Sequence, residues 1–422
     1  MRRAGGSRGP AEDTTPHLRP VERIELSEKH KTLRLILTVV FLAIGVTALV
    51  LAVLRYFSVG TGWRTVDVNQ IPPMGSSSEL ELQYDLSGGG AAASALYKRV
   101  AAVYTDAVAE GEQLFDCMAE EAGAEGLQNV NLHPGETVEV HPALYEAFEL
   151  LEEADSRFLY YAPLYSLRRD LLACSEDWEA RAFDPASDED AGRFAREAEA
   201  FAEDPGAVSL ELLGEDRVRL NVSREYAAFA EENGVTAYLD FFWLKNAFLV
   251  DYCAQRLRAE GLTAGMLSSA DGFVCSLGGS AEEFRIRIPD LADGTVYPAA
   301  SIPCTGAMQA SCLRLFPVGE DAYGRFYAAD DGTVYTRFVS GTGAEPVLPA
   351  VTGFSRTAGC AEIALRLLPA MWEEDPLPVL ETLPEAGIEY AYCADRTVFL
   401  SDASLPLEDL LEGEGFAYRR AF

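Results

Sequence analysis

Histidine, serine and cysteine are the side chains that most often act as nucleophiles, bases or metal ligands, and here few of them stand in a known pattern. Of four histidines, only His133 and His141 follow the long apolar segment of the chain. Neither belongs to a GxSxG or HExxH motif, which would indicate a hydrolase nucleophile or a zinc site. We therefore interpret both histidines as surface or helix-capping residues.

Acidic and glycine-rich segments give no clearer signal. Acidic side chains form two groups, Asp184, Asp188, Glu189 and Asp190 in the first, and Asp330 and Asp331 in the second. Neither group has the spacing of a calcium loop, so we interpret them as solvated loop residues. The glycines at 88–90 and 278–279 lack the surroundings of a phosphate-binding loop. No CxxC occurs, so zinc and thioredoxin-like chemistry are not expected.

The charge balance excludes further classes of protein. The chain has 422 residues with 67 acidic and 34 basic side chains, a net charge of -33. Such a chain repels nucleic-acid phosphates, and we expect no nucleic-acid partner. A disordered acidic chain is also excluded, because 49% of the residues are apolar and can form a sizeable core.

The elements that must position any site are predicted from apolar periodicity. Alternation of apolar and polar residues predicts strands at 80–86, 217–222 and 284–288. Helical spacing predicts helices near 91–122, 142–155, 190–203, 245–260 and 358–371. A hairpin turn is expected at Asp331-Gly332. Because no linker divides residues 70–422, we expect one compact α+β domain there.

One segment predicts a membrane anchor. Residues 35–54 contain no charge, and a helix of that length covers roughly the 30 Å of a bilayer's hydrocarbon core. Arg34 and Arg55 flank it. We predict a transmembrane helix at 35–54, after a disordered tail at 1–34 and before a spacer at 55–69. A cleaved signal peptide fits less well, because the preceding arm is long and no small-x-small cleavage site follows.

The distribution of charge predicts the orientation of that helix. Residues 1–34 carry eight Lys or Arg and five acids, whereas the remainder carries 26 basic and 62 acidic residues. The positive-inside rule then places the amino terminus in the cytoplasm and the domain outside, as in a single-pass cell-membrane protein. All eight cysteines follow the span, where disulfides are permitted but unpaired buried thiols are equally open.

The order of several short motifs resembles the FAD:protein FMN transferases. Met74-Gly75-Ser76 before the strand at 80–86 is similar to the Met-Gly-Thr and strand that open the catalytic domain of that family. Leu244 to Asp251 (LKNAFLVD) is similar to its Ala-Lys-Gly-Tyr-Ala-Val-Asp. Weaker matches follow the family's order at 131–145, 154–164, 256–263, 331–335 and 342–346, so the resemblance covers about residues 70–400.

This resemblance implies transfer of FMN from FAD to a Thr or Ser of an exported redox protein, with AMP leaving and a divalent metal on the pyrophosphate. FAD is then the implied ligand and an exported flavoprotein the implied partner. The residues that the resemblance carries over as cofactor-binding are Met74, Gly75, Lys245, Asp251, Ser311, Thr342 and Gly343. No catalytic residue is predicted.

The chain departs from the family where the metal should bind. The implied ligands fall on the carbonyl of Leu244 and on Cys360 and Ala364, and the last two offer no hard oxygen. Glu362 is a poor replacement, because it lies about 200° around the helix from Cys360. The resemblance therefore gives little support for Mg²⁺.

Other motif positions are changed as well. Thr336 and Val339 replace a His and an Asp, Asn246 replaces a Gly, and Ala270-Asp271-Gly272 replaces Gly-Gly-Asp. Bulky residues at 241–243 stand where the family has a Gly pair.

Three interpretations remain open. We favour a membrane-anchored, extracytoplasmic relative of the transferases that has lost catalysis and binds a flavin or a partner. The second is an active Mg²⁺-dependent transferase with a rebuilt metal site. The third is an unrelated extracytoplasmic α+β binding module.

Overall fold

The computed structural model describes residues 31–57, 62–66, 79–87, 91–119, 124–154, 156–278, 284–318, 324–330, 332–339, 348–402 and 405–420. The chain divides into two compact units, Met1–Ser58 and Val59–Phe422. In the first unit, the described residues form one helix, α1 (Lys31–Phe57), which includes the predicted span at 35–54. Among the described residues, no helix is long and apolar enough to cross a membrane, so the span stays a prediction.

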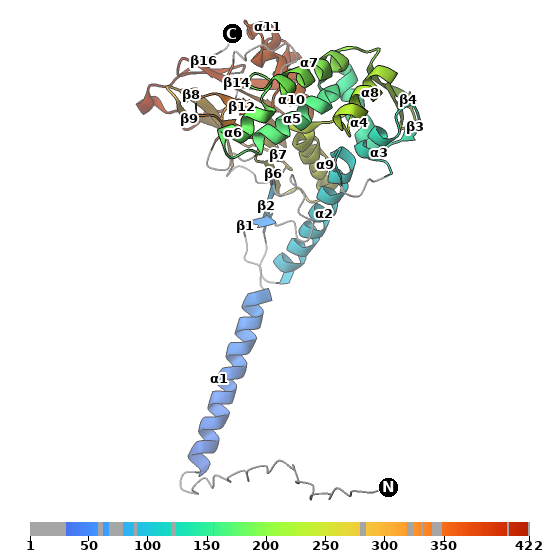
Figure 1. The fold of residues 1–422 in the computed structure, drawn as a ribbon. Coiled ribbons are helices and arrows are strands. Elements are labelled where there is room, and N and C mark those ends of the chain that lie inside the picture. The colour runs from blue at the N-terminus through green and yellow to red at the C-terminus, as the bar shows by residue number, and fades with distance from the viewer. Residues whose placement is uncertain are drawn as a thin grey trace, which may run out of the picture. The chain divides into compact units, whose positions relative to one another are not determined.

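The second unit is built on a nine-stranded sheet (Figure 1). Its strands, in spatial order, are β1 (Gly62–Val66), β2 (Leu80–Leu86), β6 (Gly265–Ser269), β7 (Phe273–Ser276), β10 (Met308–Arg314), β13 (Ala350–Ser355), β14 (Ile388–Ala394), β15 (Thr397–Leu400) and β16 (Ala417–Arg420). Neighbouring strands are antiparallel except the last pair, β15 and β16. β10 and β13 lie at its centre, where almost every residue is buried.

Three helices cover one face of this sheet: α2 (Ala91–Phe115), α9 (Lys245–Ala259) and α10 (Cys360–Leu367). In Figure 1, α2 and α9 lie side by side. Their apolar stripes and one side of most strands of the sheet form the main core, to which Leu82, Tyr104 and Leu249 belong. Burial of such stripes is the main source of stability for helices of this length.

The opposite face of the sheet carries a hairpin of β8 (Arg285–Ala292) and β9 (Thr295–Pro303). Met266, Ile288 and Phe354 belong to a second apolar core on this side. Successive residues of a strand point to opposite faces, so Met266 and Leu267 enter different cores. The sheet is therefore the middle layer of the domain.

Residues between α2 and α9 form a helical part with a three-stranded sheet. The helices are α3 (Leu127–Leu132), α4 (Pro142–Glu153), α5 (Ala162–Leu172), α6 (Asp177–Ala180), α7 (Glu189–Glu203) and α8 (Arg224–Asn233). The strands are β3 (Thr137–Glu139), β5 (Arg217–Val222) and β4 (Val208–Gly214), in that spatial order. A hairpin of β11 (Phe326–Ala328) and β12 (Val334–Thr336), and a short helix α11 (Leu377–Leu380), complete the described elements.

Most predicted elements are confirmed, and the domain is of the mixed α+β class as expected. The alternation at 80–86 forms β2, with Leu80, Leu82, Tyr84 and Leu86 buried. The helix predicted at 91–122 was too long, because α2 ends at Phe115. Asp116 follows it, and its carboxylate accepts the backbone N–H of Met118 at 2.8 Å. Such a local bond competes with the helix and ends it. Strand β1 lies within the segment 55–69 that we predicted as a spacer.

Candidate functional site

Two predicted site residues meet at the first turn of α10. The carboxylate of Asp251, on α9, accepts the backbone N–H groups of Cys360 at 2.8 Å and Ala361 at 2.9 Å. The hydroxyl of Ser311, on β10, donates to the carbonyl of Cys360 at 2.7 Å. A Cβ on Gly359 would lie 2.6 Å from Asp251 Oδ2, so this position has no room for a side chain. Asp251 and Ser311 thus fix α10 to the sheet and to α9.

Lys245 is the first residue of α9 and has partners of its own. Its ammonium is 3.1 Å from the carboxylate of Glu112 and 2.7 Å from that of Asp116. Burial disfavours the charged amine, but the two carboxylates outweigh it and raise the pKa of Lys245. Burial would also raise the pKa of Asp116, yet the nearby ammonium lowers it. Lys245 therefore joins α9 to the end of α2 as a closed ion triad.

Four other predicted site residues, Met74, Gly75, Thr342 and Gly343, lie outside the described residues. Among the predicted residues that are described, the structure brings Asp251 and Ser311 together and leaves Lys245 apart from them.

The positions implied for metal binding do not fit a metal. Cys360 and Ala364 are completely buried. The thiol of Cys360 donates to the carbonyl of Val274 at 3.3 Å, and burial raises its pKa well above the ordinary value, so it is not a thiolate ligand. Leu244 is also fully buried. Among the described residues, no three His, Cys, Asp or Glu side chains are placed to hold a metal ion.

Two of the changed motif positions, Asn246 and Asp271, belong to one buried group of charged and polar side chains, which we call the Arg337 cluster. It consists of Glu79, Asn246, Asp271, Arg325 and Arg337. The guanidinium of Arg337 lies 2.9 Å from Glu79 and 2.8 Å from Asp271. The amide of Asn246 donates to the same two carboxylates at 2.6 and 2.8 Å. Segments from β2, α9, the β6–β7 turn and the β11–β12 hairpin are joined here.

Opposite charges in the Arg337 cluster stabilise one another. Burial and the charge of Asp271 raise the pKa of Glu79, and Arg337 opposes this. Burial acts against the charge of Arg337, but Asp271 and Glu79 raise its pKa. The buried Oδ1 atoms of Asn246 and Asp271 have no hydrogen-bond partner in the described part of the chain. At 246 and 271, two positions where the chain departs from the family's motifs, the side chains therefore take part in buried hydrogen bonds and ion pairs.

Sequence reasoning missed three members of this cluster, Glu79, Arg325 and Arg337. They are separated by up to 258 residues from their partners and belong to no motif. Asn246 and Asp271 were noted only as departures from the family. An unusual signal was available in the replacement of Gly by Asn at 246, because a buried amide at a helix start requires partners.

Asp251 also lines a pocket of about 480 Å³ between α4, α9 and α10. One wall contains Phe248, Tyr252 and Phe115. The charged side chains on the other walls are Glu146, Glu362 and Arg258. Arg258 is fixed by donation to the carbonyl of Ser276 at 2.9 Å. The walls thus combine aromatic residues with an excess of carboxylates, an arrangement that suits a flat and weakly charged group.

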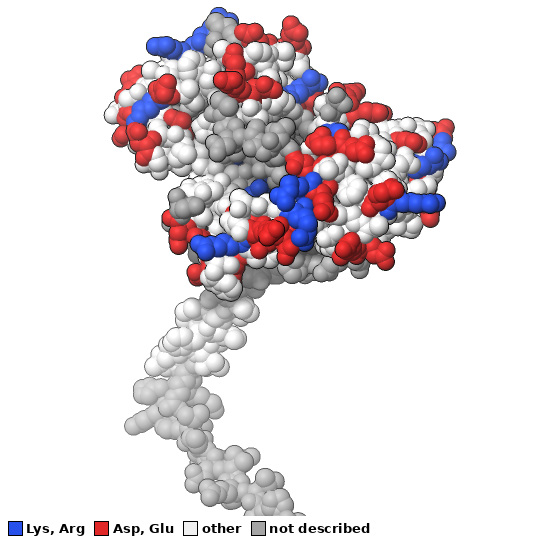
Figure 2. Space-filling view, turned by 45° about the horizontal axis from the view of Figure 1, so that its top comes forward, with Lys and Arg blue, Asp and Glu red and all other residues white. Residues whose placement is uncertain are grey.

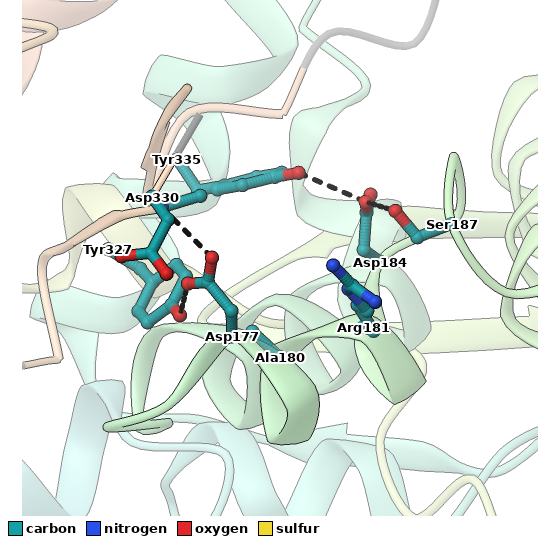
Figure 3. A pocket seen from close by; sticks show the side chains of 9 residues that line it. Asp177, Ala180, Arg181, Asp184, Ser187, Tyr327, Asp330 and Tyr335 are labelled. Atoms are coloured by element: carbon teal, nitrogen blue, oxygen red, sulfur yellow. Dashed lines mark hydrogen bonds between the residues drawn. The ribbon is translucent and has the colours of Figure 1, made fainter. Parts of the chain in front are cut away.

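A second pocket, of about 490 Å³, lies between α6 and the β11–β12 hairpin (Figure 3). The hydroxyl of Tyr327 donates to Asp177, and the backbone N–H of Asp330 donates to the same carboxylate at 2.9 Å. Across the pocket, Tyr335 donates to Asp184 at 3.0 Å. These bonds join the hairpin to the helical part and occupy the carboxylates of Asp177 and Asp184.

One interpretation of the acidic groups was wrong. Asp184 is buried, with 6% of its surface exposed, and it binds Tyr335 and Ser187 instead of lying in a solvated loop. Asp188 caps α7 by accepting the N–H of Ala191 at 2.9 Å. His141 caps α4 as expected, since its ring accepts the N–H of Ala143 at 3.1 Å.

Surface charge and cysteines complete the description of the domain. On the face drawn in Figure 2, acidic and basic side chains are interspersed. All eight cysteines lie in described ranges and are unpaired, and every one except Cys174 is buried. Of the two alternatives left open by the sequence, the structure shows unpaired thiols.

Comparison with known proteins identifies the fold. The chain is similar to the flavin transferase ApbE from Vibrio cholerae, with 15% identity, a TM-score of 0.50, and coverage of 85% of this chain and 99% of that chain. It also matches the ApbE protein of Thermotoga maritima at 14% identity and a TM-score of 0.49, covering 80% of this chain and 95% of that one. No family model and no curated protein matches the sequence. The predicted resemblance is therefore confirmed as an ApbE-like fold.

Proposed function

We propose that this chain is a membrane-anchored, extracytoplasmic protein with the ApbE-like fold that binds a flavin and does not transfer FMN. The fold supports a relation to flavin transferases, as the similarity to the Vibrio cholerae protein indicates. An exported flavoprotein is the partner class that this role implies.

The residues at the implied metal positions are the reason for proposing that the chain does not transfer FMN. Phosphoryl-group transfer requires neutralisation of charge on the pyrophosphate, which hard-oxygen ligands and a metal ion provide. Here a thiol that donates to a backbone carbonyl and a buried methyl group occupy those positions. Asp251 does not replace them, because both of its oxygens accept backbone N–H groups.

The pocket beside Asp251 supports flavin binding. Its volume of about 480 Å³ lies in the range typical of small-molecule sites. Aromatic side chains on one wall suit a flat ring system. The carboxylates of Glu146 and Glu362 disfavour phosphate groups nearby, so the ring and not the pyrophosphate is the part expected in the pocket.

Membrane anchoring rests on α1 and on the sequence around it. Large apolar side chains of this helix are exposed, among them Leu35, Phe41 and Leu49 with 66%, 68% and 65% of their surface accessible. An exposed apolar surface of this size normally meets a partner or a membrane. The basic residues that precede it support a cytoplasmic amino terminus.

The test uses the full chain in neutral detergent, incubated with FAD with and without Mg²⁺. Flavin binding is followed by quenching of flavin fluorescence. Transfer is followed by AMP release and by mass spectrometry of a Thr-containing acceptor, with an active flavin transferase in a parallel reaction. We expect saturable binding and no AMP above the protein-free background.

Two results would contradict this proposal. Mg²⁺-dependent AMP release would show that the chain is an active transferase with a rebuilt metal site. Absence of flavin binding, under conditions in which the active transferase binds FAD, would rule out the flavin-binding role.

A further inference from the structure

A third pocket lies on the opposite side of the sheet from α9 and α10. It has a volume of about 380 Å³ and is formed by the β8–β9 hairpin and the strands β2, β6, β7 and β10. Met266, Val274 and Phe284 supply apolar walls. Lys245, Asp251 and Ser311 do not line it. The pocket is therefore separate from the site proposed above.

Its charge is opposite to that of the whole chain. The charged residues that line it are Arg285, Arg287 and Arg314, and no acidic residue is among its described lining residues. The chain as a whole has a net charge of -33. This pocket with three arginines contrasts with the chain's composition, in which acidic side chains outnumber basic ones by about two to one.

Two of these arginines have no carboxylate partner among the described residues. Arg287 is exposed and forms no ion pair within the described chain. Arg314 donates to the backbone carbonyls of Ala270 at 2.8 Å and Asp271 at 3.4 Å, which fixes its guanidinium in the pocket wall. Its buried Nε has no acceptor within the ranges that the structure describes. Only Arg285 is neutralised, by Glu408 at 2.7 Å.

We propose that this pocket binds an organic phosphate, with the phosphate on Arg287 and Arg314 and an apolar ring or chain against Met266, Val274 and Phe284. A guanidinium presents a fork of N–H donors that matches phosphate oxygens. The apolar walls select against inorganic phosphate, which would leave them unfilled. A free aryl or alkyl phosphate and the headgroup of a lipid with a phosphate monoester share this chemistry.

The test measures binding by calorimetry to the full chain in neutral detergent. The probes are 1-naphthyl phosphate, dioctanoyl phosphatidic acid, 1-naphthol and inorganic phosphate. We expect at least one of the first two to bind about tenfold more tightly than naphthol and inorganic phosphate, because only they supply both parts of the ligand. Binding of the lipid alone would identify a headgroup, and binding of the naphthyl compound would identify a free organic phosphate.

The variants are Arg287→Gln and Arg314→Gln, with Arg366→Gln as the matched control. Arg366 lies on α10 and pairs with Glu362 outside this pocket. We expect the first two to weaken binding about tenfold each and the control to leave it unchanged. Arg287 is exposed, so its replacement should not disturb folding, which thermal melting verifies. Equal affinity for naphthol and naphthyl phosphate with no lipid binding, or an Arg287→Gln variant with unchanged affinity, would overturn the proposal.

Discussion

At the scale of single residues, Asp251 shows how one side chain links stability to pH. Its carboxylate binds two N–H groups of α10, yet burial raises its pKa from 3.8 to about 6. The folded state therefore retains a proton on Asp251 at pH values where the unfolded state has lost it. Stability from this group is complete below pH 4 and is lost as the pH rises to about 6.

The difference in the pKa of Asp251 between the folded and unfolded states predicts how Asp251→Asn behaves, because the amide of Asn cannot titrate. This pKa shift corresponds to about 3 kcal/mol in the free energy of unfolding. The stability of the wild type relative to the variant should therefore fall by that amount between about pH 4 and pH 7. Urea unfolding of both proteins across this range measures it. Glu362→Gln, on the same helix but partly exposed, is the control. A wild-type advantage that does not change with pH would show that Asp251 titrates normally.

Lys245 illustrates a predicted site residue with a structural role. Replacement by Met removes the ammonium that pairs with both Glu112 and Asp116, and Glu112 has only 1% of its side chain exposed. Removing one partner of a buried ion group costs about 3–5 kcal/mol. Chemical denaturation should show this loss for Lys245→Met. The triple variant Glu112→Gln, Asp116→Asn, Lys245→Met should recover most of it. A single variant as stable as the wild type would contradict the closed triad.

At the scale of elements, the close approach of β13 to α10 depends on Gly353. A Cβ at this position would lie 2.5 Å from Ile363 Cγ2 and 2.9 Å from Leu367 Cδ1. Gly353→Ala should therefore destabilise the domain by about 1–3 kcal/mol through overpacking. Gly413→Ala is the matched control, because nothing lies within 4 Å of its Cβ. In an Ile363→Ala background the cost of Gly353→Ala should shrink, and an unchanged cost would show that the helix does not lie this close.

Helices and strands could be predicted from the sequence where the pattern that indicates them involves only neighbouring residues. The alternation at 80–86 and the stripe at 245–260 depend only on neighbouring residues, and both gave the observed β2 and α9. The end of α2 depended on one side-chain bond of Asp116, which periodicity does not contain. Asp251 was named as a site residue only from the resemblance in motif order, and its pairing with Cys360 and Ala361 joins residues 109 and 110 positions apart. In the Arg337 cluster only Asn246 offered a signal, and the pairing of Arg337 with Glu79, 258 residues away, has no local signal.

At the scale of the whole molecule, the asymmetry of charge predicts how the chain is inserted. Eight Lys or Arg accompany five acids before the apolar segment, and 62 acids accompany 26 basic residues from there onward. The positive-inside rule favours retention of the Lys- and Arg-rich part in the cytoplasm, which leaves the domain after the apolar segment to be moved outward. A reporter enzyme that is active only outside the cytoplasm should therefore be active when fused after Phe422 and inactive when fused before Met1.

A variant tests whether those charges set the orientation. In this variant, Gln replaces the basic residues nearest the apolar segment, which are Arg19, Arg23, Lys29, Lys31 and Arg34. Reporter activity at the carboxyl end should fall, because the positive charges that retain the amino terminus in the cytoplasm are lost. The matched control replaces five surface Arg residues of the domain that lie far from the segment in sequence, and it should leave activity unchanged. These residues are Arg193, Arg217, Arg219, Arg356 and Arg366.

Deletion of 35–54 should release the protein from the membrane fraction. A carboxyl-terminal reporter that is inactive in the unmodified chain would contradict the orientation, and an unmodified chain found only in the soluble fraction would contradict the anchor itself.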